Sequence, residues 1–258
     1  MPKLSIKKIN LMKKNKIGIA CLTAYDASFS KLIDECGINI ILVGDSLGQV
    51  IQGSNNTHSV SMEDMLYHTK LVSIGRKNAY LIADMPINSY EKNKQALINA
   101  RRFINECGAE MVKIETNMNN FDILSYLNDK NIPVCAHIGI RPQEIKSSAE
   151  YKKKGKTTKS KICILNEAIL AEQAGAKLLI VECIEENLAK EISLKLSIPV
   201  IGIASGKYCD GQILVSYDLF GISFNGVPKF VDKKYFKIQN IKERLKKFIQ
   251  NTQKLPKS

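Results

Sequence analysis

Residues Ile38–Ser46, with the sequence INIILVGDS, hold the pattern that decides the fold. The run Ile38–Val43 is short and rich in branched aliphatic side chains, and it stops abruptly at Gly44 and Asp45. A strand with one side in solvent alternates apolar and polar residues, whereas a nearly continuous apolar run is typical of a parallel strand buried on both faces. The stretch therefore predicts a buried parallel strand that ends in an acidic residue.

The same unit, an apolar run followed by a polar residue and a helical pattern, recurs along the whole chain. The runs that predict strands are Ile17–Leu22, Ile38–Val43, Ala79–Ala83, Met111–Ile114, Val134–Ala136, Leu178–Val181, Val200–Ile203 and, more weakly, Gln212–Val215. Helical patterns between them cover Ser28–Glu35, 61–75, Lys92–Glu106, Asn120–Lys130, Ile162–Ala174 and Glu185–Leu196. About eight such units predict an α/β protein whose parallel sheet closes as a (β/α)₈ barrel. An open doubly wound sheet is the alternative, but no G-x-G-x-x-G motif follows the first run.

The bulk composition bounds the class of protein. The chain has 258 residues, which suits one barrel of roughly 250, so we expect a single domain over residues 1–258. No apolar run approaches the roughly 18 residues of a membrane span, and the basic N-terminus lacks the apolar region of a secretory signal. Seven cysteines are scattered without a C-x-x-C pair, which favours a reduced, cytoplasmic setting.

The net charge of +13 raises the alternative of a basic nucleic-acid-binding protein or a membrane-surface protein. The lysines occur throughout the chain, however, and do not interleave with aromatic residues as a base-stacking surface would require. We interpret the excess positive charge as a general feature of the composition rather than as a binding surface, and we expect neither nucleic acid nor membrane as a partner. The run Arg244–Lys247 predicts the solvated face of a terminal helix.

Acidic residues stand where the predicted strands end. Asp45, Asp84 and Glu115 close three consecutive strands, and Glu182 closes the sixth. In a barrel the side chains at the C-terminal ends of the strands converge on one mouth. Carboxylates that converge repel one another, and a hard divalent cation such as Mg²⁺ relieves the repulsion. The spacing therefore predicts a magnesium site, whereas Asp26, which directly precedes a helical pattern, is interpreted as a helix N-cap.

Other strand-end residues indicate the chemistry. Lys113 lies two residues before Glu115, so both point to one face of the strand, and Lys113 either pairs with a carboxylate or orients an anionic substrate. Glu182 stands apart from the three consecutive carboxylates and is the candidate general base. His137 is interpreted as a core or hydrogen-bonding histidine. Together these residues indicate proton abstraction next to a carbonyl, with a metal at the developing oxyanion.

Longer motifs surround these positions and carry a resemblance to a known family. They include LVGDSLG at Leu42–Gly48, ADMP at Ala83–Pro86, MVKIE at Met111–Glu115, HIGIRPQ at His137–Gln143, DGQILV at Asp210–Val215 and PKF at Pro228–Phe230. Here the chain closely resembles the ketopantoate hydroxymethyltransferase (3-methyl-2-oxobutanoate hydroxymethyltransferase) family. The resemblance covers about Ile17 to Phe230.

The resemblance implies a barrel of the phosphoenolpyruvate mutase and isocitrate lyase superfamily. It implies transfer of a hydroxymethyl group from 5,10-methylenetetrahydrofolate to 3-methyl-2-oxobutanoate, which gives 2-dehydropantoate on the route to pantothenate and coenzyme A. Family members are homo-oligomers, so a homodecamer is expected. The family's metal ligands match Asp45, Asp84 and Glu115, its substrate contacts match Asp45, Ser46, Asp84 and Lys113, and its catalytic base matches Glu182.

Two segments depart from the family pattern. Residues 148–156 read SAEYKKKGK where the family carries a glycine-rich segment, and Ala204-Ser205-Gly206 replaces a more glycine-rich turn. Both departures bear on loop mobility rather than on reaction type. The nearest rival function is a Mg²⁺-dependent carbon–carbon lyase or mutase on a related barrel.

Overall fold

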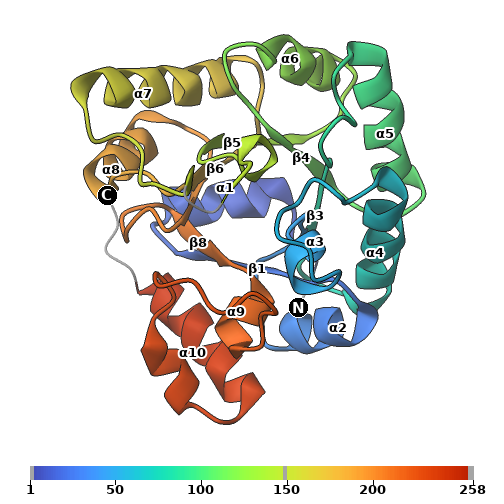
Figure 1. The fold of residues 1–258 in the computed structure, drawn as a ribbon, viewed down its shortest axis with the longest axis vertical. Helices are drawn as coiled ribbons and strands as arrows, with labels where there is room; N and C mark the ends of the chain where they lie inside the picture. The colour runs from blue at the N-terminus through green and yellow to red at the C-terminus, as the bar shows by residue number, and fades with distance from the viewer. Residues whose placement is uncertain (1–2, 148–149, 255–258) are drawn as a thin grey trace.

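The computed structural model describes residues 3–147 and 150–254, which include a closed barrel of eight parallel strands (Figure 1). The strands are β1 Ile19–Thr23, β2 Ile40–Val43, β3 Tyr80–Asp84, β4 Met111–Glu115, β5 Val134–Gly139, β6 Leu178–Glu182, β7 Val200–Ile203 and β8 Gly211–Leu214. Each strand pairs with its neighbour in sequence, and β1 pairs with β8, for example Cys21 with Ile213. The predicted barrel is confirmed, and the β1–β8 pairing excludes the open sheet.

Helices surround the barrel, and at least one lies between each pair of successive strands except β7 and β8, which residues 204–210 join without a helix (Figure 1). The longer ones are α2 Ala27–Glu35, α4 Met62–Gly75, α5 Asn93–Asn105, α6 Phe121–Asp129, α7 Thr158–Gln173, α8 Glu186–Lys195 and α10 Ile241–Gln253, with α1 Ile6–Lys14 at the start. Shorter segments are α3 Leu47–Val50, η1 Pro142–Glu144, α9 Ser216–Phe220 and η3 Lys233–Lys237. Asp26 caps α2 by accepting a hydrogen bond from the Phe29 N–H (2.9 Å), which confirms its prediction as an N-cap.

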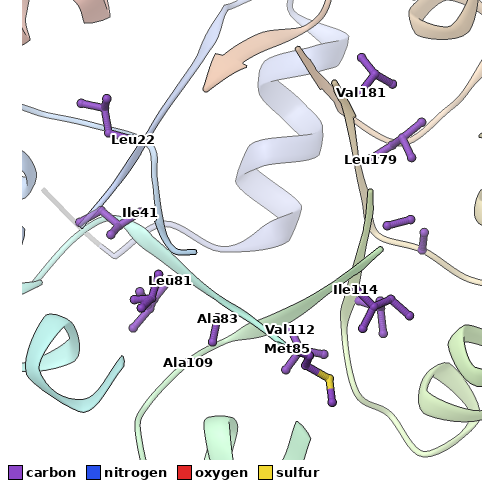
Figure 2. Packing of buried hydrophobic residues seen from close by; sticks show 14 of the residues in the cluster. Leu22, Ile41, Leu81, Ala83, Met85, Ala109, Val112, Ile114, Leu179 and Val181 are labelled. Carbon is purple, nitrogen blue, oxygen red and sulfur yellow. The ribbon is translucent and has the colours of Figure 1, made fainter. Parts of the chain in front are cut away.

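Side chains along each strand alternate between the barrel interior and the helical shell. In β2, Ile40 and Leu42 belong to the cluster inside the barrel, whereas Ile41 belongs to the cluster beneath the helices. Figure 2 shows Ile41, Leu81 and Ile114 directed away from the interior towards the surrounding helices. The outer cluster is far larger than the inner one, so most of the apolar burial lies between sheet and helices.

The same alternation places the polar strand-end residues inside the barrel. Met111 belongs to the inner cluster, so Lys113 and Glu115 face inward from β4. By the same register Asp84 follows the inner residue Ile82 on β3. The inner face is therefore apolar near the N-terminal ends of the strands and charged at the C-terminal ends.

Helix α1 closes the N-terminal end of the barrel, a role that the sequence reasoning did not foresee. Ile9 is fully buried within the inner cluster. Lys13 Nζ donates to the carbonyls of Ser193 and Ile198 and lies 2.8 Å from Asp210 Oδ2, below β7 and β8. The many lysines of this segment made its one buried apolar face hard to recognise in the sequence.

The terminal helix α10 exists, but its predicted solvated face is only partly correct. Lys246 and Lys247 are exposed, whereas Arg244 and Leu245 are buried. The Arg244 guanidinium donates to the carbonyls of Ile238 and Phe220 (2.6 and 2.8 Å), so it ties α10 to the end of α9. In the sequence, an arginine that donates to buried backbone carbonyls cannot be distinguished from an exposed arginine.

Candidate active site

A cavity of about 530 Å³ opens at the C-terminal ends of the strands. Five of the six predicted site residues line it: Asp45, Ser46, Asp84, Lys113 and Glu182. Glu115 instead borders an adjoining cavity of about 310 Å³. His137, interpreted from the sequence as a core or hydrogen-bonding histidine, also lines the main cavity. The strand-end positions thus converge as the barrel geometry predicts.

Asp84 and Lys113 form the centre of the charged cluster. Lys113 Nζ lies 2.5 Å from Asp84 Oδ2, and both side chains are almost fully buried. The Asp45 backbone N–H donates to the same carboxylate oxygen over 3.4 Å. The sequence left two roles open for Lys113, namely pairing with a carboxylate and orienting an anionic substrate. Its position is compatible with both, because it pairs with Asp84 and also lines the cavity.

Burial and like charge raise the proton affinities of these carboxylates. Burial, opposed by the charge of Lys113 and reinforced by that of Asp45, raises the pKa of Asp84 to about 7. Burial, with Asp45 and Asp84 as further causes, also raises the pKa of Glu115 well above its usual range. Burial lowers the pKa of Lys113, but the nearby carboxylates, Asp84 first, outweigh this and raise it overall. The cluster thus has more buried negative charge than one lysine offsets.

The buried carboxylate oxygens suit Mg²⁺ better than a metal ion that takes all of its ligands from the protein. Asp84 Oδ1 is buried and has no hydrogen-bond partner, which leaves one acidic oxygen unsatisfied. No three His, Cys, Asp or Glu residues in the described ranges are assembled as a ready-made metal site. Mg²⁺ binds through one or two carboxylates and keeps several waters, so it needs no such cage. Asp45 and Asp84, with Glu115 behind them, fit this ion.

Gln143 and Tyr90 connect the acidic residues, and neither was singled out from the sequence. The Gln143 amide nitrogen donates to Asp45 Oδ2 (2.8 Å), and the Gln143 backbone N–H donates to Glu115 Oε2 (3.1 Å). The Tyr90 hydroxyl donates to the Gln143 amide oxygen (2.5 Å), which fixes the amide orientation. Gln143 lies in η1 and Tyr90 in the loop before α5, where the rule about strand ends does not apply, although Gln143 lies within the quoted family motif.

Glu182 and His137 form a second pair in the cavity. His137 Nε2 lies 3.2 Å from Glu182 Oε2, and its Nδ1 lies 3.7 Å from Glu115 Oε1. Burial, then the charge of Lys113, lowers the pKa of His137 well below its usual range, so the ring is neutral. Burial raises the pKa of Glu182 to about 8, with Lys113 opposing and Asp45 adding to the effect. A carboxylate with such proton affinity is suited to accept a proton near neutral pH.

Tyrosines border the reactive residues on two sides. The Tyr25 hydroxyl pairs with Ser46 Oγ at 2.9 Å, which holds Ser46 at the cavity edge. Tyr151 lines the cavity, and the charge of Glu182 is one cause, after burial, of its raised pKa. Tyr151 belongs to the segment 148–156 that departs from the family pattern. Ser148 and Ala149 lie outside the described residues, but Lys154 pairs with Ile184 beyond the end of β6.

The backbone next to Glu182 is tightly constrained. Cys183 and Ala204, which follow β6 and β7, both have left-handed backbone conformations with φ of 52°. Gly139 has a φ of +95°, and a Cβ there would lie 2.3 Å from the Glu182 carbonyl oxygen. Non-glycine residues in this conformation store backbone strain, which is commonly found at functional sites. Glycine at position 139 lets β5 approach β6 closely enough to set the position of Glu182.

Comparison with known proteins places this geometry in a family. The model of the ketopantoate hydroxymethyltransferase family matches residues 3–256. The chain belongs to this family. The 3-methyl-2-oxobutanoate hydroxymethyltransferase of Ruthia magnifica is 47% identical over 247 residues, which cover 96% of this chain and 95% of that protein. The same-named protein of Buchnera aphidicola (strain 5A) is 44% identical, covering 96% and 94%. Like its relatives in the family, the chain is a hydroxymethyltransferase.

Solved structures of other proteins share the fold of the barrel. A phosphonomutase-like protein of Burkholderia cenocepacia superposes with a TM-score of 0.62 at 12% identity, covering 84% of this chain and 94% of that one. A phosphonopyruvate hydrolase solved with oxalate and Mg²⁺ superposes with a TM-score of 0.60 at 12% identity, covering 83% and 81%. At such identities the likeness concerns the fold alone. Among the helices that the structure describes, none is long and apolar enough to span a bilayer.

Proposed function

We propose that the chain transfers a hydroxymethyl group from 5,10-methylenetetrahydrofolate to 3-methyl-2-oxobutanoate through an enolate, and that it needs Mg²⁺. The observation that carries the proposal is the pairing of one high-pKa carboxylate, Glu182, with a separate buried acidic cluster in the same cavity. The first provides a base, and the second provides a place for a cation. The phosphonopyruvate hydrolase with the same fold, solved with oxalate and Mg²⁺, supports a place for both a small oxo anion and the ion.

The metal is assigned to Asp45, Asp84 and Glu115. When bound, Mg²⁺ supplies positive charge that acidifies the proton next to the keto group and stabilises the enolate. Lys113 donates to Asp84 and faces the cavity, so its ammonium can also bind the negative charge of the oxo acid. Ser46, held by Tyr25, offers a hydroxyl to the same substrate.

Glu182 is the proposed base for C3 of the oxo acid. As a carboxylate it accepts the C3 proton. Water breaks the two C–N bonds of the donor's methylene bridge, which releases tetrahydrofolate and the one-carbon unit at the oxidation level of formaldehyde. The C3 carbanion then forms a bond to that carbon, and the oxygen that came from water takes up a proton and becomes the hydroxyl. Neutral His137 lies 3.2 Å from Glu182 and adds no positive charge that would weaken the basicity of the carboxylate.

Product analysis tests the reaction. The enzyme is incubated with 3-methyl-2-oxobutanoate and 5,10-methylenetetrahydrofolate, with and without Mg²⁺, and the products are identified by mass spectrometry. We expect 2-dehydropantoate and tetrahydrofolate in equal amounts, and only when Mg²⁺ is present. Cleavage of 2-oxo acids without folate would instead identify the rival lyase.

Metal binding tests the ligand assignment independently of turnover. Calorimetry with Mg²⁺ alone compares wild type, Asp84→Ala and the matched control Asp129→Ala, which removes an exposed carboxylate on α6. Asp84→Ala should abolish measurable binding, and the control should leave it unchanged. Unchanged affinity in Asp84→Ala would show that the ligand assignment is wrong.

We also propose that the enzyme works in the cytoplasm and as a homodecamer. The scattered free cysteines fit a reducing cytoplasm. The homodecamer that the family resemblance implies is tested by mass photometry of the purified protein, where a decamer gives ten times the mass of the chain. A smaller species at micromolar concentration would contradict it.

A further inference from the structure

The cavity has a second wall that the proposed chemistry does not use. Its reactive residues come from β2 to β6, whereas the ends of β7 and β8, helix α9 and the segment Ser223–Phe230 form the other side. That wall is largely apolar: Ile203, Leu214, Val215, Val227, Pro228 and Phe230. Such a surface suits a flat ring system more than a small charged acid.

One buried carboxylate interrupts this apolar wall. Asp218 lines the cavity from the first turn of α9, and only 6% of its surface is exposed. Ser223 Oγ donates to Asp218 Oδ1 (2.5 Å), and no described residue donates a hydrogen bond to Oδ2. No Lys or Arg within the described ranges forms an ion pair with it. Asp218 is therefore a buried acceptor with capacity to spare.

The position of Asp218 is fixed relative to the reactive residues. The Ser216 backbone N–H, where α9 begins, donates to Thr23 Oγ1 at the end of β1 (2.9 Å). Tyr25 lies within electrostatic reach of both Asp218 and Asp45, since after burial both charges raise its pKa. Asp218 thus belongs to the same cavity as the acidic cluster, on the wall that α9 and the ends of β7 and β8 form.

A buried carboxylate without a cation needs N–H donors from something else. Burial, which Ser223 only partly offsets, raises the pKa of Asp218 to about 6, so the group is ionised at neutral pH but poorly compensated. The oxo acid carries only acceptor oxygens and would be repelled. The pterin ring of a folate is flat, and its 2-amino group and adjacent ring N–H form a paired donor edge. Of the two proposed substrates, only the folate complements Asp218.

We propose that Asp218 binds the 2-amino-4-oxo edge of the pterin ring, with the apolar wall from Ile203 to Phe230 against the ring faces. This assignment rests on the proposed folate donor. It makes the cavity a two-part site, with the oxo acid at the β2–β6 side and the folate ring at the β7–α9 side. The carboxylate accepts two parallel N–H bonds, an arrangement that adds specificity as well as affinity.

Binding of tetrahydrofolate, measured by calorimetry under anaerobic conditions, tests the assignment. Asp218→Asn keeps the size of the side chain but presents an amide in place of two acceptor oxygens. We expect it to weaken tetrahydrofolate binding by at least about 30-fold, the loss typical of a buried charge-assisted pair. A 2-desamino analogue of tetrahydrofolate, which keeps only the ring N–H of that edge, should distinguish wild type from Asp218→Asn by a clearly smaller factor than tetrahydrofolate does, because one of the two donors is gone.

Two controls separate recognition from loop structure. Ser223→Ala removes the hydrogen bond to Asp218 but keeps the carboxylate, and should change tetrahydrofolate affinity by less than about threefold. Deuterium exchange at C3 of 3-methyl-2-oxobutanoate, measured without folate, should be unchanged in Asp218→Asn. Wild-type affinity in Asp218→Asn, or an equal loss in Ser223→Ala, would overturn the assignment. If wild type binds no tetrahydrofolate and makes no product, the proposed function itself fails, which is a different outcome.

Discussion

The two sides of the cavity differ in the kind of side chains that line them. The β2–β6 side gathers Asp84, Lys113 and Glu182 at buried strand ends, where Lys113 and Asp84 form a short ion pair. The β7–α9 side is largely apolar, with Asp218 as its buried carboxylate and with Asn225 and Lys229 also on it. The difference indicates a division of labour in which one side moves a proton and the other side binds a ring. Variants that affect one side and spare the other can therefore break or sharpen this account.

The largest expected effect comes from the base. Glu182→Gln keeps the volume of the side chain but cannot accept the C3 proton, and we expect product formation to fall by about 10³-fold. Tetrahydrofolate affinity should stay within about twofold, because Glu182 is not one of the groups assigned to the pterin ring. Steady-state kinetics and calorimetry measure the two quantities, and loss of both would argue against separate sides.

The pH profile sharpens the same point. Glu182 acts only when deprotonated, and burial raises its pKa to about 8. The rate of C3 exchange should therefore rise with pH and level off above about 8, whereas an unshifted carboxylate would already be fully active in mildly acidic solution. A rate that is flat across the neutral range would contradict the role of Glu182.

The lysine should have the next largest effect. Lys113→Met removes the buried cation beside Asp84, and we expect a loss of about 10²-fold in kcat, the size seen when one group that stabilises developing negative charge is deleted. The loss should appear in C3 exchange as strongly as in product formation. Lys177→Met, at a half-buried lysine before β6, is the matched control and should retain full activity.

The supporting residues should have smaller effects. Gln143→Ala removes the side-chain amide that donates to Asp45 but keeps the backbone N–H that donates to Glu115, and Tyr90→Phe frees the Gln143 amide. We expect about tenfold weaker Mg²⁺ binding in Gln143→Ala and a smaller change in Tyr90→Phe, as is usual for groups that orient metal ligands. Calorimetry with Mg²⁺ alone checks both, and unchanged affinity in Gln143→Ala would show that the contacts are incidental.

Substitutions at the end of the barrel opposite the site should lower the stability of the fold but leave the catalytic rate unchanged. Ile9→Ala leaves a void inside the barrel below the inner cluster, and the free energy of unfolding should fall by about 2–4 kcal/mol. Activity per folded molecule should be unchanged. Denaturant unfolding and kinetics at low temperature measure the two, and a loss of activity in the folded variant would show that the closing helix acts on the site.

The sequence predicted those parts of the protein that repeat. Apolar runs such as Ile38–Val43 mark parallel strands because both faces are buried, and residues at their ends must meet in one mouth. That reasoning was enough to place Asp84 and Glu182 in one cavity. It ended strands one to three residues early where polar residues such as His137 and Glu182 continue them inward.

The rest depended on loops and on tertiary contacts. Gln143, Tyr151 and Asp218 reach the site from segments without periodicity, so their places follow from chain geometry rather than from local pattern. The segments Asp210–Val215 and Pro228–Phe230 carried the family resemblance but had no role derived from the residues. The structure places Ile213–Val215 and Pro228–Phe230 along the cavity wall, whereas Asp210 pairs with Lys13 at the opposite end of the barrel.

Exchange at C3 of 3-methyl-2-oxobutanoate, followed by NMR in D₂O with Mg²⁺ and no folate, tests the division of labour most directly. The account predicts exchange in wild type and in Asp218→Asn at rates within about twofold of each other, and almost none in Glu182→Gln. Exchange at the wild-type rate in Glu182→Gln would contradict the account, and so would its loss in a folded Asp218→Asn enzyme.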